Sequence, residues 1–155
     1  MAEYHGGCSC GEVRFKVLKE PMFSHACHCH LCQKATSSAF IIHHMIEKTY
    51  FIITEGETSD FKGPSGSDRN HRVKRCASCG YAIVSYWEGN GMAVAKGGAL
   101  DEPDQLPPRA HIFVERKLHW VGLPEDVPQY QRMYDRHEAW PQESLDRFLL
   151  AQKNA

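Results

Sequence analysis

Residues 27–32 read CHCHLC, so three cysteines fall within six positions. Cys27, Cys29 and Cys32 are separated by histidines and a leucine, in a stretch short enough to form a single turn. A C-x-x-C knuckle of a zinc protein normally supplies two thiolates to one ion. A third thiol in the same loop allows that loop to hold a metal ion without ligands from the rest of the chain.

The other four cysteines form two further clusters. Cys8 and Cys10 make a C-x-C pair, and Cys76 and Cys79 make a C-x-x-C pair within RCASCG. The odd total of seven and an N-terminus without a secretory signal argue against a disulfide framework. A thioredoxin-like redox role would need a βαβ context, whereas the residues that flank the C-x-x-C pair read as strands.

The number of thiols predicts two zinc ions per chain. Four cysteines close one tetrahedral structural site, and three remain, which is the pattern of a catalytic zinc with an open fourth position. Spacing alone does not determine which clusters pair, but the simplest partition joins the two two-cysteine clusters. The alternative is a structural Cys₃His site around the three-cysteine loop. Its fourth ligand would come from His25, His28, His30, His43, His44 or His71.

Composition narrows the class of protein. The chain has 155 residues, which favours one domain, and its 42% hydrophobic and 24% charged residues are typical of a soluble globular protein. A net charge of −1 argues against a nucleic-acid partner, and no apolar run is long enough to span a membrane. We therefore expect a protein of the cytoplasm, where thiols stay reduced.

Short runs rich in β-branched and aromatic residues predict an antiparallel β domain. The strands are expected at 12–18, 39–46, 49–54, 71–75, 81–87, 92–95, 110–115 and 118–121. The runs 39–46 and 49–54 are expected to form a hairpin. Loops are predicted at 62–70, which is rich in glycine and serine, and at 101–108, which holds three prolines.

The end of the chain has a different period. Leu145, Phe148 and Leu149 follow helical i, i+3, i+4 spacing, and Pro141 suits the first turn of a helix. We expect these apolar side chains to pack on the β domain or on a second subunit, because so short a helix is marginal in water by itself. A homo-oligomer is one expectation that follows.

Several segments resemble the glutathione-dependent formaldehyde-activating enzyme family, whose relatives include the centromere protein V group. They occur in the family's order and cover residues 4–130. They read GGCSCGEVRF at 6–15, CHCHLCQK at 27–34, FIITEGE at 51–57, KRCASCG at 74–80, KGGALD at 96–101 and HIFVERKLHWVGLPEDVPQY at 111–130.

The resemblance implies a compact, mainly β fold of the Mss4-like type with a short helical C-terminal tail. Residues 1–130 would form the zinc domain and 131–155 a helical extension. Cys8, Cys10, Cys76 and Cys79 would hold the structural zinc, and Cys27, Cys29 and Cys32 the catalytic one. The implied activity is that of a carbon–sulfur lyase, the joining of glutathione to formaldehyde as S-hydroxymethylglutathione. The family usually has glycine shortly after the third cysteine of the loop, where this chain has Ser37.

A zinc ion with three thiolates is a weak Lewis acid for water but suits a substrate thiol, which it keeps as a nucleophilic thiolate. Our hypothesis is that the glutathione thiol occupies the open position and attacks an aldehyde held nearby. His28, His30 or His71 would move the proton. The glutathione carboxylates would meet cations among Lys34, Arg69, Arg72 and Arg75. The alternative function is a non-catalytic, zinc-stabilised module that binds other proteins.

Overall fold

The computed structural model describes residues 2–63 and 70–155, which form two β sheets and three α-helices. The strands are β1 (Tyr4–Gly7), β2 (Arg14–Val17), β3 (Phe23–Cys27), β4 (Ile41–Glu47), β5 (Phe51–Glu55), β6 (Thr58–Lys62), β7 (His71–Cys76), β8 (Ala82–Trp87), β9 (Met92–Lys96) and β10 (His111–Ile112). The helices are α1 (His30–Thr36), α2 (Arg136–Ala139) and α3 (Gln142–Lys153). Short 3₁₀ turns are η1 (Lys48–Tyr50), η2 (Gly97–Ala99), η3 (Pro103–Gln105) and η4 (Val114–Arg116).

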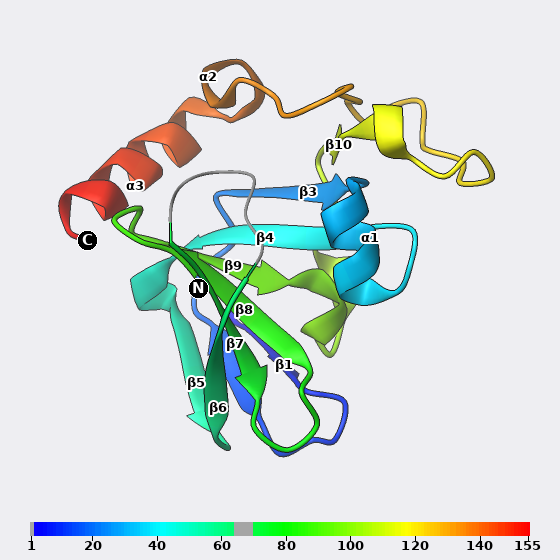
Figure 1. Cartoon of the computed structure of the whole chain (residues 1–155). Helices are drawn as coiled ribbons and strands as arrows, with labels where there is room; N and C mark the ends of the chain where they lie inside the picture. Colours follow the sequence, from blue (N-terminus) through cyan, green and yellow to red (C-terminus); the bar gives the residue numbers. More distant parts are fainter. Residues whose placement is uncertain (1, 64–69) are drawn as a thin grey trace.

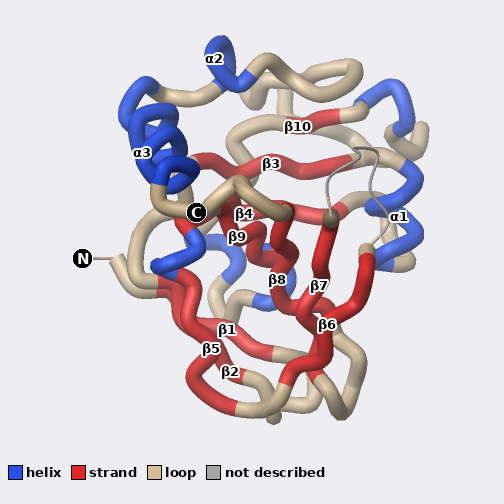
Figure 2. The backbone as a smooth tube through the Cα atoms, turned by 60° about the vertical axis from the view of Figure 1, so that its left-hand side comes forward, coloured by secondary structure: helices blue, strands red, loops and turns tan. Residues whose placement is uncertain are grey.

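The small sheet has the order β1-β2-β5 and is antiparallel throughout. Alternation along β2 buries Phe15 and Val17 on one face, as expected for a half-buried strand. These side chains share a core with Ile46, Ile83 and Ala95 from the large sheet. Figure 2 shows β1, β2 and β5 gathered at the opposite end of the molecule from α2.

The large sheet has seven strands in the order β10-β3-β4-β9-β8-β7-β6. Every neighbouring pair is antiparallel except β10 with β3, which is parallel. One face of this sheet packs in the core shared with the small sheet. The other face carries a second core, which includes Met45 and Val94, and the groups described below as the candidate site.

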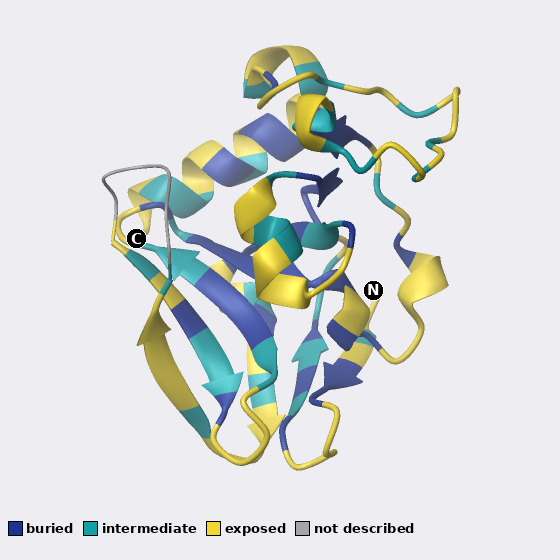
Figure 3. Cartoon of the chain, turned by 45° about the vertical axis from the view of Figure 1, so that its right-hand side comes forward, coloured by how far each residue is buried: buried dark blue, intermediate teal, exposed yellow. Residues whose placement is uncertain are grey.

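The C-terminal segment covers part of that second face. Tyr134, Trp140, Leu145 and Phe148 are buried in the same core as Phe23 of β3. Figure 1 shows α2 and α3 along one side of the β structure, with α1 near the far end of β3 and β4. Figure 3 shows that α3 alternates between buried and exposed residues, which is the pattern of an amphipathic helix.

The mainly β fold with a helix near the C-terminus confirms the expected class. Helix α3 begins after Pro141 and buries Leu145 and Phe148 on the β structure as predicted. Leu149 is 47% exposed and does not pack fully on this chain's β structure, so its packing on a second subunit stays a prediction. It lies on the outer side of the helix, next to the exposed Leu150.

Two predictions about strands are wrong. The runs 39–46 and 49–54 do not form a hairpin, because η1 turns the chain so that β4 pairs with β3 and β9 while β5 pairs with β2 in the other sheet. Residues 118–121 form a turn rather than a strand. The loop expected at 101–108 is present and contains η3. The loop expected at 62–70 lies mostly outside the described residues.

Candidate active site

The structure gathers the four sulfurs of Cys8, Cys10, Cys76 and Cys79 within 4.8 Å of one another. The sulfurs of Cys8 and Cys10 are 3.3 Å apart, and those of Cys10 and Cys76 are 3.7 Å apart. Four sulfurs held tetrahedrally at about 2.3 Å from one ion would be separated by about 3.8 Å. This all-thiol donor set therefore fits a closed zinc site, and none of the seven cysteines of the chain forms a disulfide.

Each of the two knuckles of this cluster ends on a glycine. After Cys8 the chain turns through Gly11, whose N–H donates to the Cys8 carbonyl, and after Cys76 it turns through Gly80, whose N–H donates to the Cys76 carbonyl. Both glycines have positive φ, at 84° and 73°, which L side chains rarely adopt. The turns bring backbone N–H groups to the sulfurs, from Val13 to Cys8 at 3.2 Å and from Cys79 to Cys76 at 3.5 Å.

The second cluster lies where β3 meets α1. The sulfurs of Cys27, Cys29 and Cys32 are within 4.8 Å of one another. Cys27 ends β3, and Cys29 is the N-cap of α1, where its sulfur accepts from the Cys32 N–H at 3.4 Å. Gln33 ties this loop to η4, since its side-chain amide donates to the carbonyls of His28 at 2.7 Å and Arg116 at 2.9 Å. The short loop thus presents three sulfurs to one point.

Ser37 ends α1 with φ 52°, in the left-handed region that favours glycine. Its N–H donates to the Gln33 carbonyl, as in a helix C-cap. This conformation gives a physical reason for the glycine that the family resemblance led us to expect near this position. The serine therefore leaves backbone strain at the end of the three-cysteine loop.

No histidine among the described residues joins the three sulfurs as a fourth member of the cluster. His43 comes near, with Nε2 3.6 Å from the Cys32 sulfur. Three of the other candidates have partners elsewhere. His25 bonds to the Tyr134 hydroxyl, His28 to His111, and His44 to Ser24. Three of the four positions around an ion at this cluster would be filled from the loop.

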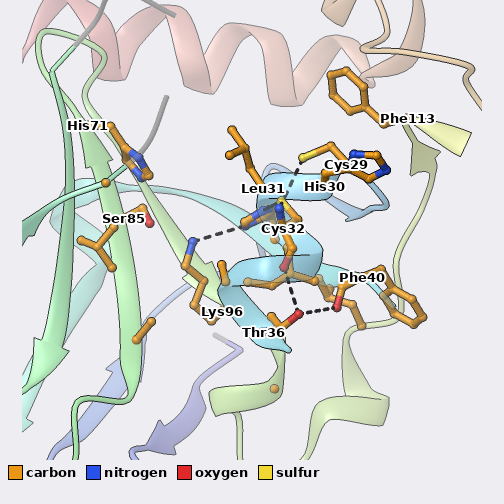
Figure 4. Close-up of a pocket in the computed structure, with 18 of the residues that line it drawn as sticks. Cys29, His30, Leu31, Cys32, Thr36, Phe40, His71, Ser85, Lys96 and Phe113 are labelled. Carbon is orange, nitrogen blue, oxygen red and sulfur yellow. Dashed lines mark hydrogen bonds between the residues drawn. The ribbon is translucent and has the colours of Figure 1, made fainter. Parts of the chain in front are cut away.

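A cavity of about 1130 Å³ opens beside the three-cysteine loop, and Cys29 and Cys32 line it. Figure 4 shows His71, Ser85 and Lys96 on one side of it and Cys29, His30, Leu31 and Cys32 on the other. Apolar side chains make much of the remaining wall, among them Phe40, Phe61, Val73, Trp87 and Phe113. A mostly apolar cavity with a few convergent polar groups is typical of a small-molecule site.

Positive side chains exceed negative ones around the cavity. Lys62, Arg75, Lys96 and Arg116 line it, whereas Glu115 is the acidic side chain among its described lining residues. The Arg75 guanidinium donates to the Gly80 carbonyl at 3.0 Å and has no carboxylate partner within the described chain. The cavity therefore favours an anionic ligand.

Burial controls the charge of Lys96 and His43, which line the cavity, and of His25 on the neighbouring strand. It lowers the pKa of Lys96 to about 8, while the thiols of Cys32 and Cys27 act in the opposite direction. Burial, followed by the charge of Lys96, lowers the pKa of His25 to about 3 and holds the pKa of His43 well below its usual value. Both imidazoles are therefore neutral at pH 7.

The chain was compared with known proteins. A family model described as glutathione-dependent formaldehyde-activating enzyme matches residues 3–116, which include all seven cysteines. The chain belongs to this family. A protein of Halomonas elongata named "Putative glutathione-dependent formaldehyde-activating enzyme" is 26% identical over 126 residues, covering 76% of this chain and 79% of the relative. A crystal structure of a Rhodobacter sphaeroides protein aligns with 81% of this chain and 98% of its own, at 15% identity and a TM-score of 0.48.

Membership of the formaldehyde-activating enzyme family confirms the resemblance. Of the predicted proton carriers, His30 and His71 line the cavity and His28 does not. Of the predicted carboxylate-binding cations, Arg75 lines the cavity, but Lys34 and Arg72 do not. Arg69 lies outside the described residues.

No helix within the described residues is long and apolar enough to span a membrane.

The sequence analysis did not single out Lys96, Arg116 or Ser85, and it named His43 only as one of six candidate ligands. The sequence does contain a pattern that could have identified Lys96. This lysine is the first residue of the KGGALD segment and the cation that ends the buried apolar strand β9. Arg116 and Ser85 carry no such signal. They reach the cavity only because η4 and β8 lie beside it in the fold.

Proposed function

We propose that the protein catalyses the reversible joining of a carboxylate-bearing thiol, glutathione, to formaldehyde. The thiol sulfur forms a bond to the carbonyl carbon, the carbonyl π bond opens, and the thiol proton ends on the new hydroxyl oxygen. The product is S-hydroxymethylglutathione, and the reverse direction breaks the carbon–sulfur bond, as in a lyase. The reaction needs no oxidant, no reductant and no water.

The observation that carries this proposal is the position of the three-cysteine loop. Its three sulfurs converge beside a cavity of about 1130 Å³, and two of the three cysteines line that cavity. The four-cysteine cluster has no residue in the cavity lining. Cys27, Cys29 and Cys32 would hold the catalytic zinc, and Cys8, Cys10, Cys76 and Cys79 the structural one. Zinc bound by three ligands with an open position acts as a Lewis acid that favours the thiolate form of a thiol.

The side chains of the cavity would bind and orient the peptide part of the thiol. Arg75 and Arg116 would meet carboxylates, because a guanidinium pairs with a carboxylate through two parallel hydrogen bonds. The apolar wall would exclude water around the reacting carbon. His30 or His71 would take the thiol proton on an imidazole nitrogen and return it to the new hydroxyl, since both line the cavity.

These substrates also suggest the setting of the reaction. A glutathione-dependent enzyme whose seven cysteines form no disulfide fits the cytoplasm, where thiols stay reduced. The small-molecule thiol and aldehyde are the partners we propose. The net charge of −1 gives no reason to propose a nucleic-acid partner.

The experiment is a rate measurement with a panel of thiols. The rate at which the adduct forms from ¹³C-formaldehyde would be followed by NMR exchange and compared with the uncatalysed rate. Adduct formation should be accelerated with glutathione and much less with its diethyl ester, and it should not be accelerated at all with S-methylglutathione. No acceleration with any thiol and aldehyde of the panel would overturn the proposal and favour a binding module.

A further inference from the structure

A row of polar side chains crosses three neighbouring strands on the cavity face of the large sheet. The register pairs His25 of β3 with His43 of β4, and His43 with Lys96 of β9. Residues directly opposite in adjacent strands lie on the same face of a sheet. His43 and Lys96 both line the cavity beneath the three-cysteine loop.

The atoms of this row form a connected path to one sulfur. Lys96 Nζ is 3.4 Å from His43 Nδ1, and His43 Nε2 is 3.6 Å from Cys32 Sγ. An ammonium group can only donate, so Nδ1 of the neutral imidazole must accept. The imidazole proton is then on Nε2, and the N–H points at the Cys32 sulfur. The lysine thus fixes the tautomer of the histidine.

Lys96 is a buried cation without a carboxylate partner among the described residues. The residue is 8% exposed. A buried cation without a counter-charge is costly. Three thiolates around a divalent ion carry one net negative charge, which this ammonium would offset.

We propose that His43 and Lys96 are positioning residues of the three-cysteine centre, with His43 donating its Nε2–H to the Cys32 thiolate and Lys96 holding the donating tautomer and balancing the charge. This inference rests on the metal site of the proposed function. A hydrogen bond to a metal-bound thiolate withdraws charge from the sulfur and favours the ionised ligand. The pair therefore tunes how firmly the loop holds its ion.

The test measures metal binding in the absence of substrate. Zn²⁺ or Co²⁺ would be titrated into the full-length protein in competition with a chromophoric chelator, with the second equivalent reporting the three-cysteine loop. His43→Phe should weaken that second ion roughly 10- to 100-fold, as is typical when an outer-shell partner is lost. It should also move the sulfur-to-cobalt charge-transfer band to lower energy, because the sulfur regains charge.

Three further variants separate positioning from packing. His43→Gln restores a side-chain N–H and should recover much of the affinity and of the band position. Lys96→Met should weaken the second ion as well, but by less in the His43→Phe background than in the wild type, because part of the lysine's effect passes through the histidine. Lys74→Met removes a charge of an exposed ion pair with Asp60 and serves as the control.

Each outcome decides the inference without reference to turnover. An unchanged second affinity and an unchanged cobalt band in His43→Phe would overturn it, and so would additive effects of His43→Phe and Lys96→Met. A wild-type protein that binds only one ion per chain would overturn it as well. Failure of the thiol panel to react, combined with these metal shifts, would overturn the proposed reaction alone.

Discussion

Replacing Cys76 by serine should cost the protein much more stability than replacing Cys29. The four-cysteine cluster joins Cys10 to Cys76 across 66 positions of the chain, and it ties the end of β1 to the end of β7. The three-cysteine loop joins residues that are only a few positions apart, between β3 and α1. Loss of an ion from the first cluster therefore releases far more chain than loss from the second.

The magnitude follows from loop closure. Treating each ion as a cross-link, a loop of about 66 residues contributes about 4 kcal/mol, and a loop of about five residues contributes about 2 kcal/mol. Domains of this size lose about 2–4 °C of melting temperature per kcal/mol. Cys76→Ser should then lower the melting temperature by about 8–16 °C through this effect alone. Cys29→Ser should lower it by about half as much.

The assay is thermal unfolding of both variants, with Cys10→Ser as a matched control. Cys10 is exposed, so its replacement disturbs little packing, yet it should destabilise the protein as Cys76→Ser does. Equal or larger destabilisation by Cys29→Ser would refute the assignment of structural and catalytic clusters. A Cys10→Ser variant with the stability of the wild type would refute the cross-link reasoning.

Three more predictions concern single side chains. Ser37→Gly should raise the free energy of unfolding by about 0.5–1 kcal/mol in denaturant titration, because glycine relieves the left-handed φ. Burial raises the pKa of the Glu47 carboxyl, but the two hydrogen bonds from Arg147 outweigh burial and lower this pKa below its usual value. The pair therefore stabilises the fold fully at pH values above the usual carboxyl pKa, and this stabilisation is lost as the pH falls. Arg147→Met should cost about 3 kcal/mol at pH 7 and flatten the acid side of the stability profile. Arg75→Gln should raise KM for glutathione about 10-fold with kcat nearly unchanged in steady-state kinetics, and an effect on kcat alone would contradict a binding role.

The parts of the fold that sequence patterns predicted are those with a local physical cause. Alternation along β2 identifies its buried face, and the helical spacing of Leu145 and Phe148 identifies α3. The strands that were missed lack such a cause. All five residues of β3 are buried, so it has no alternation, and β6 is a mostly exposed edge strand with polar side chains.

The candidate site likewise has parts that local sequence patterns predict and parts that depend on the fold. Cysteine spacing predicted that the thiols within each cluster gather, because two ligands from one turn constrain the geometry locally, but spacing did not determine which clusters pair. The cavity depends on contacts between distant segments. Lys96, Arg116 and His43 come from β9, η4 and β4, and only the strand order and register of the large sheet bring the first and last of these together. The false hairpin has the same origin, since η1 sends β5 to another sheet.

The central claim is that the three-cysteine loop holds the ion at which a thiol–aldehyde adduct forms. The most direct measurement combines zinc per chain with the rate of S-hydroxymethylglutathione formation in the wild type and in Cys29→Ser. The wild type should hold two zinc ions and accelerate the reaction. Cys29→Ser should stay folded, hold about one zinc ion, and leave the reaction at its uncatalysed rate. A folded Cys29→Ser variant that lacks the second zinc and still accelerates the reaction would contradict the claim.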